Sequence, residues 1–308
     1  MSQRLPQQLS VMECIEAGAK QLTAAGVSFG HGTQNAFDEA AWLILWQLGV
    51  PLDTLDSVKN LPITQAQHNE IASLFIARIE TRKPAAYLTR EAWLQGVSFY
   101  VDERAIVPRS LIAELLVDPD LGAQLDVWLP ANTRRVLDLC TGNGSLAVLA
   151  AMAFPEISVE GADLSLDALA VADINVNKHA LQKRITLFQS DVLAKATGEY
   201  DLIFCNPPYV NAKSMELLPA EYQKEPRMAL DGNACGSSDG MDFVRKLLAQ
   251  VSSYMREQAV LVLEIGHERT NFETAFPGLE VVWLQTSAGP DQVLLISRDM
   301  LSRAKLLK

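Results

Sequence analysis

The sequence has few residues of the kinds that build metal centres and redox sites. Among 308 residues there are only four cysteines and four histidines. They are Cys14, Cys140, Cys205 and Cys235, and His31, His68, His179 and His267. The cysteines have no metal-binding or redox spacing, and the histidines form no ligand motif. We therefore expect no metal, and free thiols in a reducing compartment.

Long apolar segments are also missing. The longest apolar run, Ala40 to Trp46, is far too short to span a bilayer, and the start, Met1 to Pro6, has no secretory apolar core. These features predict a cytoplasmic protein that does not enter a membrane.

An excess of basic charge is absent as well. The formal net charge is −11, which argues against a protein held on nucleic acid by phosphate neutralisation and is compatible with a basic protein as substrate. Apolar residues make up 49% of the chain, enough for a sizeable core, and the length predicts about two domains.

The first part of the chain, residues 1–85, has apolar residues at helical spacing and no convincing strand. Leu9, Met12 and Ile15 begin one such series, and Gly49 and Pro51 separate it from later ones. We predict a small helical domain that recognises the substrate. Residues 86–110 contain two short strands around a glycine turn, and we interpret them as a hairpin linker.

The remaining residues, 111–308, alternate strand, turn and helix. Short apolar strands are predicted at 135–140, 157–162, 185–189 and 200–205, with helices at 145–154, 166–179 and 241–255. Alternation of this kind predicts an α/β fold with a mostly parallel, Rossmann-like sheet covered by helices on both faces.

A glycine-rich turn follows the first of these strands. Gly142 and Gly144 would let the backbone pass close to a ligand, and the helix start behind them favours an anionic group such as a carboxylate. Because residues 142–147 also fit the G-x-G-x-x-A pattern, the turn alone leaves a nicotinamide dinucleotide open.

Three aspartates occur in or directly after three successive strands. Asp138 lies within the first strand, Asp163 at the end of the second, and Asp191 just after the third. Together they suit the ammonium, the ribose and the adenine of S-adenosylmethionine. This pattern favours S-adenosylmethionine over a dinucleotide.

The fourth strand runs into Asn206-Pro207-Pro208-Tyr209. Two prolines stop the sheet and leave carbonyls without local donors. Asn206 and Pro207 would supply two acceptors for a planar –NH2 group, and Tyr209 would supply an aromatic face. By accepting hydrogen bonds from both N–H groups, these two residues would orient a weakly nucleophilic amide or amine nitrogen toward a methyl donor.

These motifs resemble the protein-glutamine N5-methyltransferases. The resemblance covers about residue 80 to the end, and further includes residues 225–230 (Glu-Pro-Arg-Met-Ala-Leu) and 236–243 (Gly-Ser-Ser-Asp-Gly-Met-Asp-Phe). It implies a class I methyltransferase fold, S-adenosylmethionine as cofactor, S-adenosylhomocysteine as product, and Asn206, Pro207, Pro208 and Tyr209 as the substrate site. The cofactor-binding residues it implies are Asp138, Cys140, Thr141, Gly142, Asn143, Gly144, Asp163, Leu164, Asp191, Val192 and Asn206.

The segment after Pro108 indicates the branch of this family. Release-factor enzymes carry Pro-Arg-Pro-Glu-Thr-Glu there, whereas this chain has Pro-Arg-Ser-Leu-Ile-Ala-Glu at 108–114. With Cys140, this resembles the branch that methylates a glutamine of large-subunit ribosomal protein three (uL3), although Leu111 departs from that branch's usual Pro. Release factors remain an alternative substrate. A DNA amino-methyltransferase and a cofactor-binding protein without catalysis are more remote, since the chain is acidic and the tetrapeptide is intact.

Overall fold

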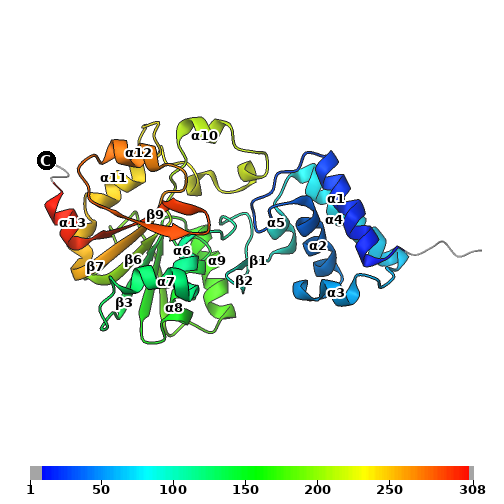
Figure 1. Cartoon of the computed structure of the whole chain (residues 1–308), viewed down its shortest axis with the longest axis horizontal. Helices are drawn as coiled ribbons and strands as arrows, with labels where there is room; N and C mark the ends of the chain where they lie inside the picture. Colours follow the sequence, from blue (N-terminus) through cyan, green and yellow to red (C-terminus); the bar gives the residue numbers. More distant parts are fainter. Residues whose placement is uncertain (1–8, 305–308) are drawn as a thin grey trace, which may run out of the picture. The chain divides into compact units, whose positions relative to one another are not determined.

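A computed structural model describes residues 9–304 of the chain and divides into two compact units (Figure 1). The helical unit runs up to Glu91 and also includes Pro219–Lys224; the second unit comprises Ala92–Leu218 and continues from Glu225. The helical unit therefore continues past the boundary expected at residue 85 and contains six residues from much later in the sequence.

The helical unit is built from helices, and its three longest ones each begin at a side-chain cap. The helices are α1 (Val11–Ala24), α2 (Ala36–Gln47), α3 (Leu55–Val58), α4 (Gln65–Thr81) and α5 (Ala85–Thr89), with a 3-10 turn at Leu52–Thr54. Ser10 and Thr64 form capping boxes at the starts of α1 and α4. Gly18 of α1 lies directly against the ring of Phe75, where a Cβ atom would come within 2.4 Å. Close helix packing of this kind forms the core of this unit.

A two-stranded hairpin begins the second unit. Strands β1 (Ala92–Leu94) and β2 (Val97–Phe99) pair antiparallel through a turn in which Gln95 and Gly96 both have positive φ, at 50° and 74°. Positive φ at both turn positions matches the twist of the flanking strands. The hairpin expected from the sequence is therefore confirmed.

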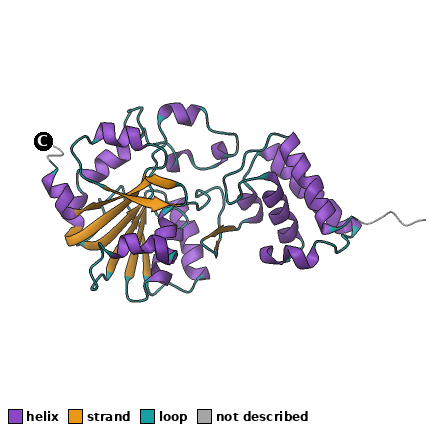
Figure 2. Cartoon of the chain, in the orientation of Figure 1, coloured by secondary structure: helices purple, strands orange, loops and turns teal. Residues whose placement is uncertain are grey.

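The second unit contains a seven-stranded sheet (Figure 2). Its strands are β3 (Arg135–Leu139), β4 (Ser158–Asp163), β5 (Ile185–Gln189), β6 (Tyr200–Cys205), β7 (Met255–Glu264), β8 (Val282–Thr286) and β9 (Gly289–Ser297). Their order is β5-β4-β3-β6-β7-β9-β8, with β3 to β7 parallel and β9 antiparallel to both neighbours. The predicted α/β architecture is confirmed.

Helices cover both faces of this sheet, which is why its central strands are apolar nearly throughout. Val136 and Leu202 pack in one core cluster with α6 (Ile112–Val117) and α8 (Ser145–Ala153). Their neighbours Leu137 and Ile203 pack in the other, with α11 (Asp242–Leu248) and α12 (Arg269–Ala275). The remaining helices are α7 (Pro119–Asp126), α9 (Leu166–Lys178), α10 (Ala212–Glu216) and α13 (Arg298–Arg303).

One predicted helix is shorter than expected. The helix predicted at 241–255 ends as α11 at Leu248, a 3-10 turn follows at Val251–Tyr254, and Met255 already belongs to β7. Tyr200 pairs with Met255 but Leu202 with Val260, so the start of β7 is irregular. Its exposed polar residues at 256–258 hide the strand pattern in the sequence.

Among residues 9–304, no helix combines the length and apolarity that a bilayer crossing needs.

Candidate active site

A cavity of about 460 Å³ lies in the second unit at the carboxyl ends of β3, β4, β5 and β6. The chain moves outward from β3 to β4 and β5 and then returns to β6 on the other side of β3. The loops after β3 and β6 therefore diverge, and open α/β sheets bind ligands at such a switch point.

The glycine turn forms one wall of this cavity. Gly142 has φ +55° and Gly144 has φ +80°, conformations that favour glycine. A Cβ atom on Gly144 would lie 3.1 Å from the Cβ of Ala172 in α9, so a side chain there would separate α8 from α9. Gly142 N donates a hydrogen bond of 2.9 Å to Asp163 Oδ2. The turn is thereby fixed to the end of the neighbouring strand.

Asp138 lies beneath this turn and is fully buried. Its Oδ2 accepts hydrogen bonds from Thr141 Oγ1 at 2.6 Å and from Ala147 N at 3.0 Å. Its Oδ1 is buried without a hydrogen-bond partner among the described residues. Burial raises the pKa of this carboxyl to about 7. An unpaired carboxylate oxygen in this position fits a cationic group, directly or through a water molecule.

Asp163 and Asp191 both line the cavity. Besides Gly142, Asp163 accepts a hydrogen bond at Oδ1 from Ser165 N at 2.9 Å, and burial raises its pKa. Asp191 Oδ2 lies 2.5 Å from the Nζ atom of Lys246, which also lines the cavity. The carboxylate for which an adenine contact is predicted, that of Asp191, is therefore already paired with the Lys246 ammonium.

Two non-glycine residues of the cavity wall have left-handed backbone. Cys140 has φ +61° and Val192 has φ +51°, and a β-branched residue rarely adopts this conformation. Strained backbone of this kind is concentrated at functional sites. A hydrogen bond with the Cys205 thiol, together with burial, raises the pKa of Cys140, so it remains a thiol at neutral pH.

The tetrapeptide after β6 contributes a further part of the cavity wall. Asn206 and Pro208 line the cavity, whereas Pro207 is buried and the ring of Tyr209 packs over Gly266. A Cβ atom on Gly266 would come within 2.6 Å of that ring, and Gly266 has φ +52°. The side chain of Asn206 makes no hydrogen bond to another residue within 9–304, which leaves its amide group available to a ligand.

The structure gathers most of the predicted site residues around this one cavity, but not all of them. Those that line it are Cys140, Gly142, Asp163, Leu164, Asp191, Val192, Asn206 and Pro208. Those that do not are Asp138, Thr141, Asn143, Gly144, Pro207 and Tyr209. Asp138, Thr141, Gly144 and Tyr209 instead support the lining segments through the contacts described above.

The cavity also has walls to which the sequence assigned no role. They are formed by Arg104–Ile106, Pro226–Ala229, and Phe243 with Lys246 from α11. Glu225, directly before the second of these segments, accepts bidentate hydrogen bonds of 2.7 Å from Arg109 and one of 2.9 Å from Val107 N. Residues 225–230 contributed to the family resemblance, but only the fold brings residues 226–229 to the cavity.

Glu264 and His267 raise the question of a general base. Glu264 is buried, and its Oε2 accepts hydrogen bonds from Ser110 Oγ at 2.6 Å and Leu111 N at 2.9 Å. Burial raises the pKa of Glu264 to about 7. The carboxyl group therefore holds the start of α6. Among residues 9–304, no three potential metal-ligating side chains come together.

Comparison with known proteins places this site in a family. A family model described as "Methyltransferase small domain" matches residues 118–222. The chain is 48% identical to the ribosomal protein uL3 glutamine methyltransferase of Bordetella pertussis, over 95% of this chain and 96% of that protein.

Two further relatives carry the same description. The Burkholderia pseudomallei protein is 48% identical over 93% of this chain and 94% of its own length, and the Neisseria meningitidis protein is 42% identical over 95% and 94%. Identity at this level over nearly the whole length shows common descent for both units. The chain belongs to the family of ribosomal protein uL3 glutamine methyltransferases.

Proposed function

We propose that the protein transfers a methyl group from S-adenosylmethionine to the side-chain N5 of a glutamine in ribosomal protein uL3. The products are N5-methylglutamine and S-adenosylhomocysteine, and the reaction takes place in the cytoplasm without stable nucleic-acid binding. The observation that carries the proposal is the Asn206 amide, available at one wall of a cavity whose other wall is a glycine turn.

The residues of the strand ends suit S-adenosylmethionine. When bound, this group supplies an electrophilic sulfonium methyl. The unpaired buried oxygen of Asp138 fits its ammonium, the Asp163 carboxylate its ribose hydroxyls, and Asp191 its adenine amino group. The left-handed backbone at Cys140 and Val192 lets the strand ends follow a ligand closely.

The tetrapeptide prepares the acceptor nitrogen. We assign the side-chain carbonyl of Asn206 and the backbone carbonyl of Pro207 as acceptors for the two N–H bonds of the glutamine amide. Holding both bonds orients the nitrogen lone pair and favours the tetrahedral geometry that develops during methyl transfer. The Tyr209 ring, seated on Gly266, packs against the amide plane.

No dedicated base is needed in this mechanism. The nitrogen becomes strongly acidic once it carries the methyl group, so it can lose its proton to water after transfer. Glu264 is engaged by Ser110 and Leu111 and is not assigned a proton-transfer role.

The test offers the purified protein tritium-labelled S-adenosylmethionine with unmodified uL3 or with a release factor. We expect label on uL3, and none when its acceptor glutamine is replaced. Label on the release factor alone would retain the chemistry and overturn the assigned substrate. The helical unit is proposed to recognise the protein substrate.

A further inference from the structure

The six residues Pro219–Lys224 belong to the helical unit although both flanking segments belong to the second unit. They form the tip of a loop, Val210–Asp231, that begins directly after Tyr209. At the base of this loop, Val210 N donates to Leu230 O at 2.9 Å and Gly232 N donates to Val210 O at 3.1 Å. The base therefore holds the two ends of the loop together beside the tetrapeptide.

The loop returns into the cavity wall. After the tip, Glu225 accepts two hydrogen bonds from Arg109, and Pro226–Ala229 then line the cavity. One continuous segment thus connects the tetrapeptide at 206–209, a tip packed in the helical unit and the cavity wall at 226–229. The tip is therefore linked to both segments by the covalent chain.

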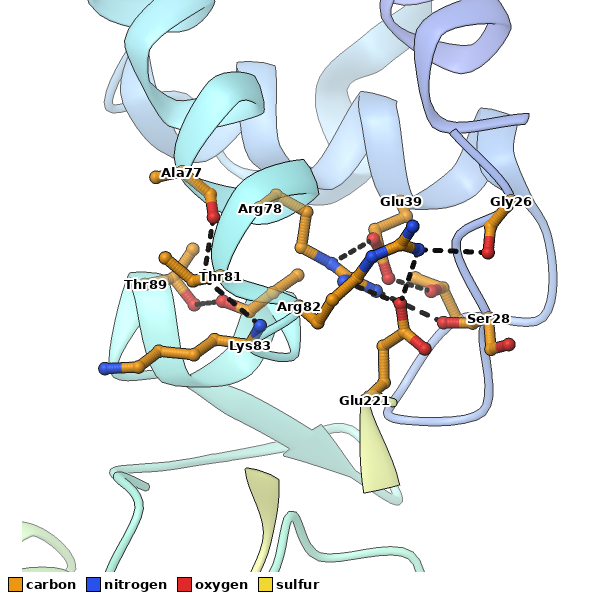
Figure 3. A network of polar contacts seen from close by, with 12 residues as sticks. Gly26, Ser28, Glu39, Ala77, Arg78, Thr81, Arg82, Lys83, Thr89 and Glu221 are labelled. Carbon is orange, nitrogen blue, oxygen red and sulfur yellow. Dashed lines mark hydrogen bonds and ion pairs between the residues drawn. The ribbon is translucent and has the colours of Figure 1, made fainter. Parts of the chain in front are cut away.

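Buried charges hold this tip inside the helical unit (Figure 3). The Glu221 side chain is 2% exposed, and its Oε1 lies 3.4 Å from Arg78 Nη1 and 3.2 Å from Arg82 Nη1. Arg78 is fully buried and also donates to Glu39 Oε1 at 2.8 Å and to Ser28 O at 3.2 Å. Burial raises the pKa of Glu39, whereas the pKa of Glu221 is lowered by hydrogen bonds and the two arginines despite its burial. Glu221 thus accepts two buried guanidinium contacts, one from Arg78 and one from Arg82.

The next residue reinforces the attachment. The ring of Tyr222 lies 4.2 Å, centroid to centroid, from the buried ring of His31. Its hydroxyl would be 2.3 Å from a Cβ atom on Gly30, which has φ +124°. A shaped pocket in the helical unit thus receives the tip, and a loop that served only to join α10 to the 3-10 turn at Arg227–Ala229 would not need one.

We infer that Glu221 is a positioning residue for glutamine methylation: its ion pairs with Arg78 and Arg82 fix the 210–231 loop, and through it the acceptor tetrapeptide and the 226–229 wall. This inference rests on the proposed function. It assigns the helical unit a second task besides binding substrate, which is to hold the acceptor side of the site in its working shape. The strand-end residues of the cofactor side lie outside this loop.

Glu221→Gln tests the inference, and Glu39→Gln is its matched control. Each variant removes one carboxyl group from the same buried Arg78, but only Glu221 lies on the loop. With Glu221→Gln we expect kcat/KM for uL3 to fall about tenfold or more, the effect of one or two residues regaining backbone freedom. The Kd of S-adenosylmethionine should change less than about threefold, a difference of under 1 kcal/mol. Glu39→Gln should leave both quantities near the wild-type values.

Hydrogen exchange gives a second readout that does not depend on the substrate. Amides of the 210–231 loop should exchange faster in Glu221→Gln than in Glu39→Gln, while those of β3 to β6 keep wild-type protection. Equal effects of both variants on kcat/KM and on exchange would reduce Glu221 to part of the helical core and overturn the inference. Wild-type protein that methylates no uL3 would refute the proposed function instead, and the exchange experiment would still decide how the loop is held.

Discussion

Replacing Asp138 by Asn should stabilise the ligand-free protein at alkaline pH and weaken the binding of S-adenosylmethionine. Burial raises the pKa of Asp138 from 3.8 to about 7. Between these values the folded state holds a proton that the unfolded state has lost, so the free energy of unfolding falls as pH rises through this window. A shift of about 7 − 3.8, roughly 3 units, corresponds to about 4 kcal/mol at 1.4 kcal/mol per unit.

Glu264 adds to the same pH dependence. Its pKa is raised from 4.5 to about 7, also by burial, so its contribution has the same sign and is about 3 kcal/mol. Asp138→Asn removes only the Asp138 contribution. From pH 5 to pH 8, a range that spans the folded-state pKa of about 7, the variant should lose about 3 kcal/mol less stability than the wild type.

Urea denaturation of both proteins at the two pH values measures this difference, with exposed Asp53→Asn as control. Isothermal titration at pH 8 should show S-adenosylmethionine binding the Asp138 variant about 10- to 100-fold more weakly, the range for a hydrogen bond to a charged group. Parallel pH profiles for wild type and variant would refute the assignment of a raised pKa to the buried Asp138 carboxyl. Unchanged affinity for S-adenosylmethionine would show that the Asp138 carboxylate does not bind the ammonium of the cofactor.

Three further substitutions probe the two sides of the cavity. Asn206→Ala should lower kcat about 10²- to 10³-fold with little change in cofactor Kd, because it removes a polar group aimed at the transition state; full turnover in a labelling assay would contradict its role. Asp163→Ala should weaken S-adenosylmethionine binding about tenfold or more through the lost ribose contact, and also loosen Gly142, which thermal shift with and without cofactor would show. Gly266→Ala combines φ +52° with a contact of 2.6 Å to the Tyr209 ring, so we expect about 1–3 kcal/mol lower stability and reduced kcat. A Gly266 variant with wild-type melting temperature and turnover would show that the Tyr209 ring is not held there.

The local sequence pattern was sufficient to predict an element wherever its residues are of one kind. The strands at 185–189 and 200–205 have the predicted bounds, and the turn at Gln95 and Gly96 follows from its glycine. It failed where the pattern is mixed. The exposed start of β7 did not suggest a strand, and α7 was not predicted although Asp118 caps it and Pro119 begins it.

The candidate site likewise contains residues that could be predicted from the sequence and residues that could not. Strand-end residues such as Asp163 and Asn206 could be predicted because the carboxyl ends of parallel strands share one edge of the sheet. The walls at Arg104–Ile106 and Pro226–Ala229 could not, because no periodicity relates a loop to a cavity far away in the sequence. The same holds for Gly266, whose need for a small side chain exists only once Tyr209 lies over it.

The sequence by itself determined the alternating architecture, the glycine turn, the three acids and the tetrapeptide at 206–209, because each depends on residues within one turn or one strand. Tertiary structure alone decided that Asp138 keeps an unpaired buried oxygen, that Glu264 supports α6, and that Glu221 lies among the helices of the other unit. Burial and charge pairing are properties of neighbours distant in sequence. They arise only when the chain brings Glu221 to Arg78 across 143 positions.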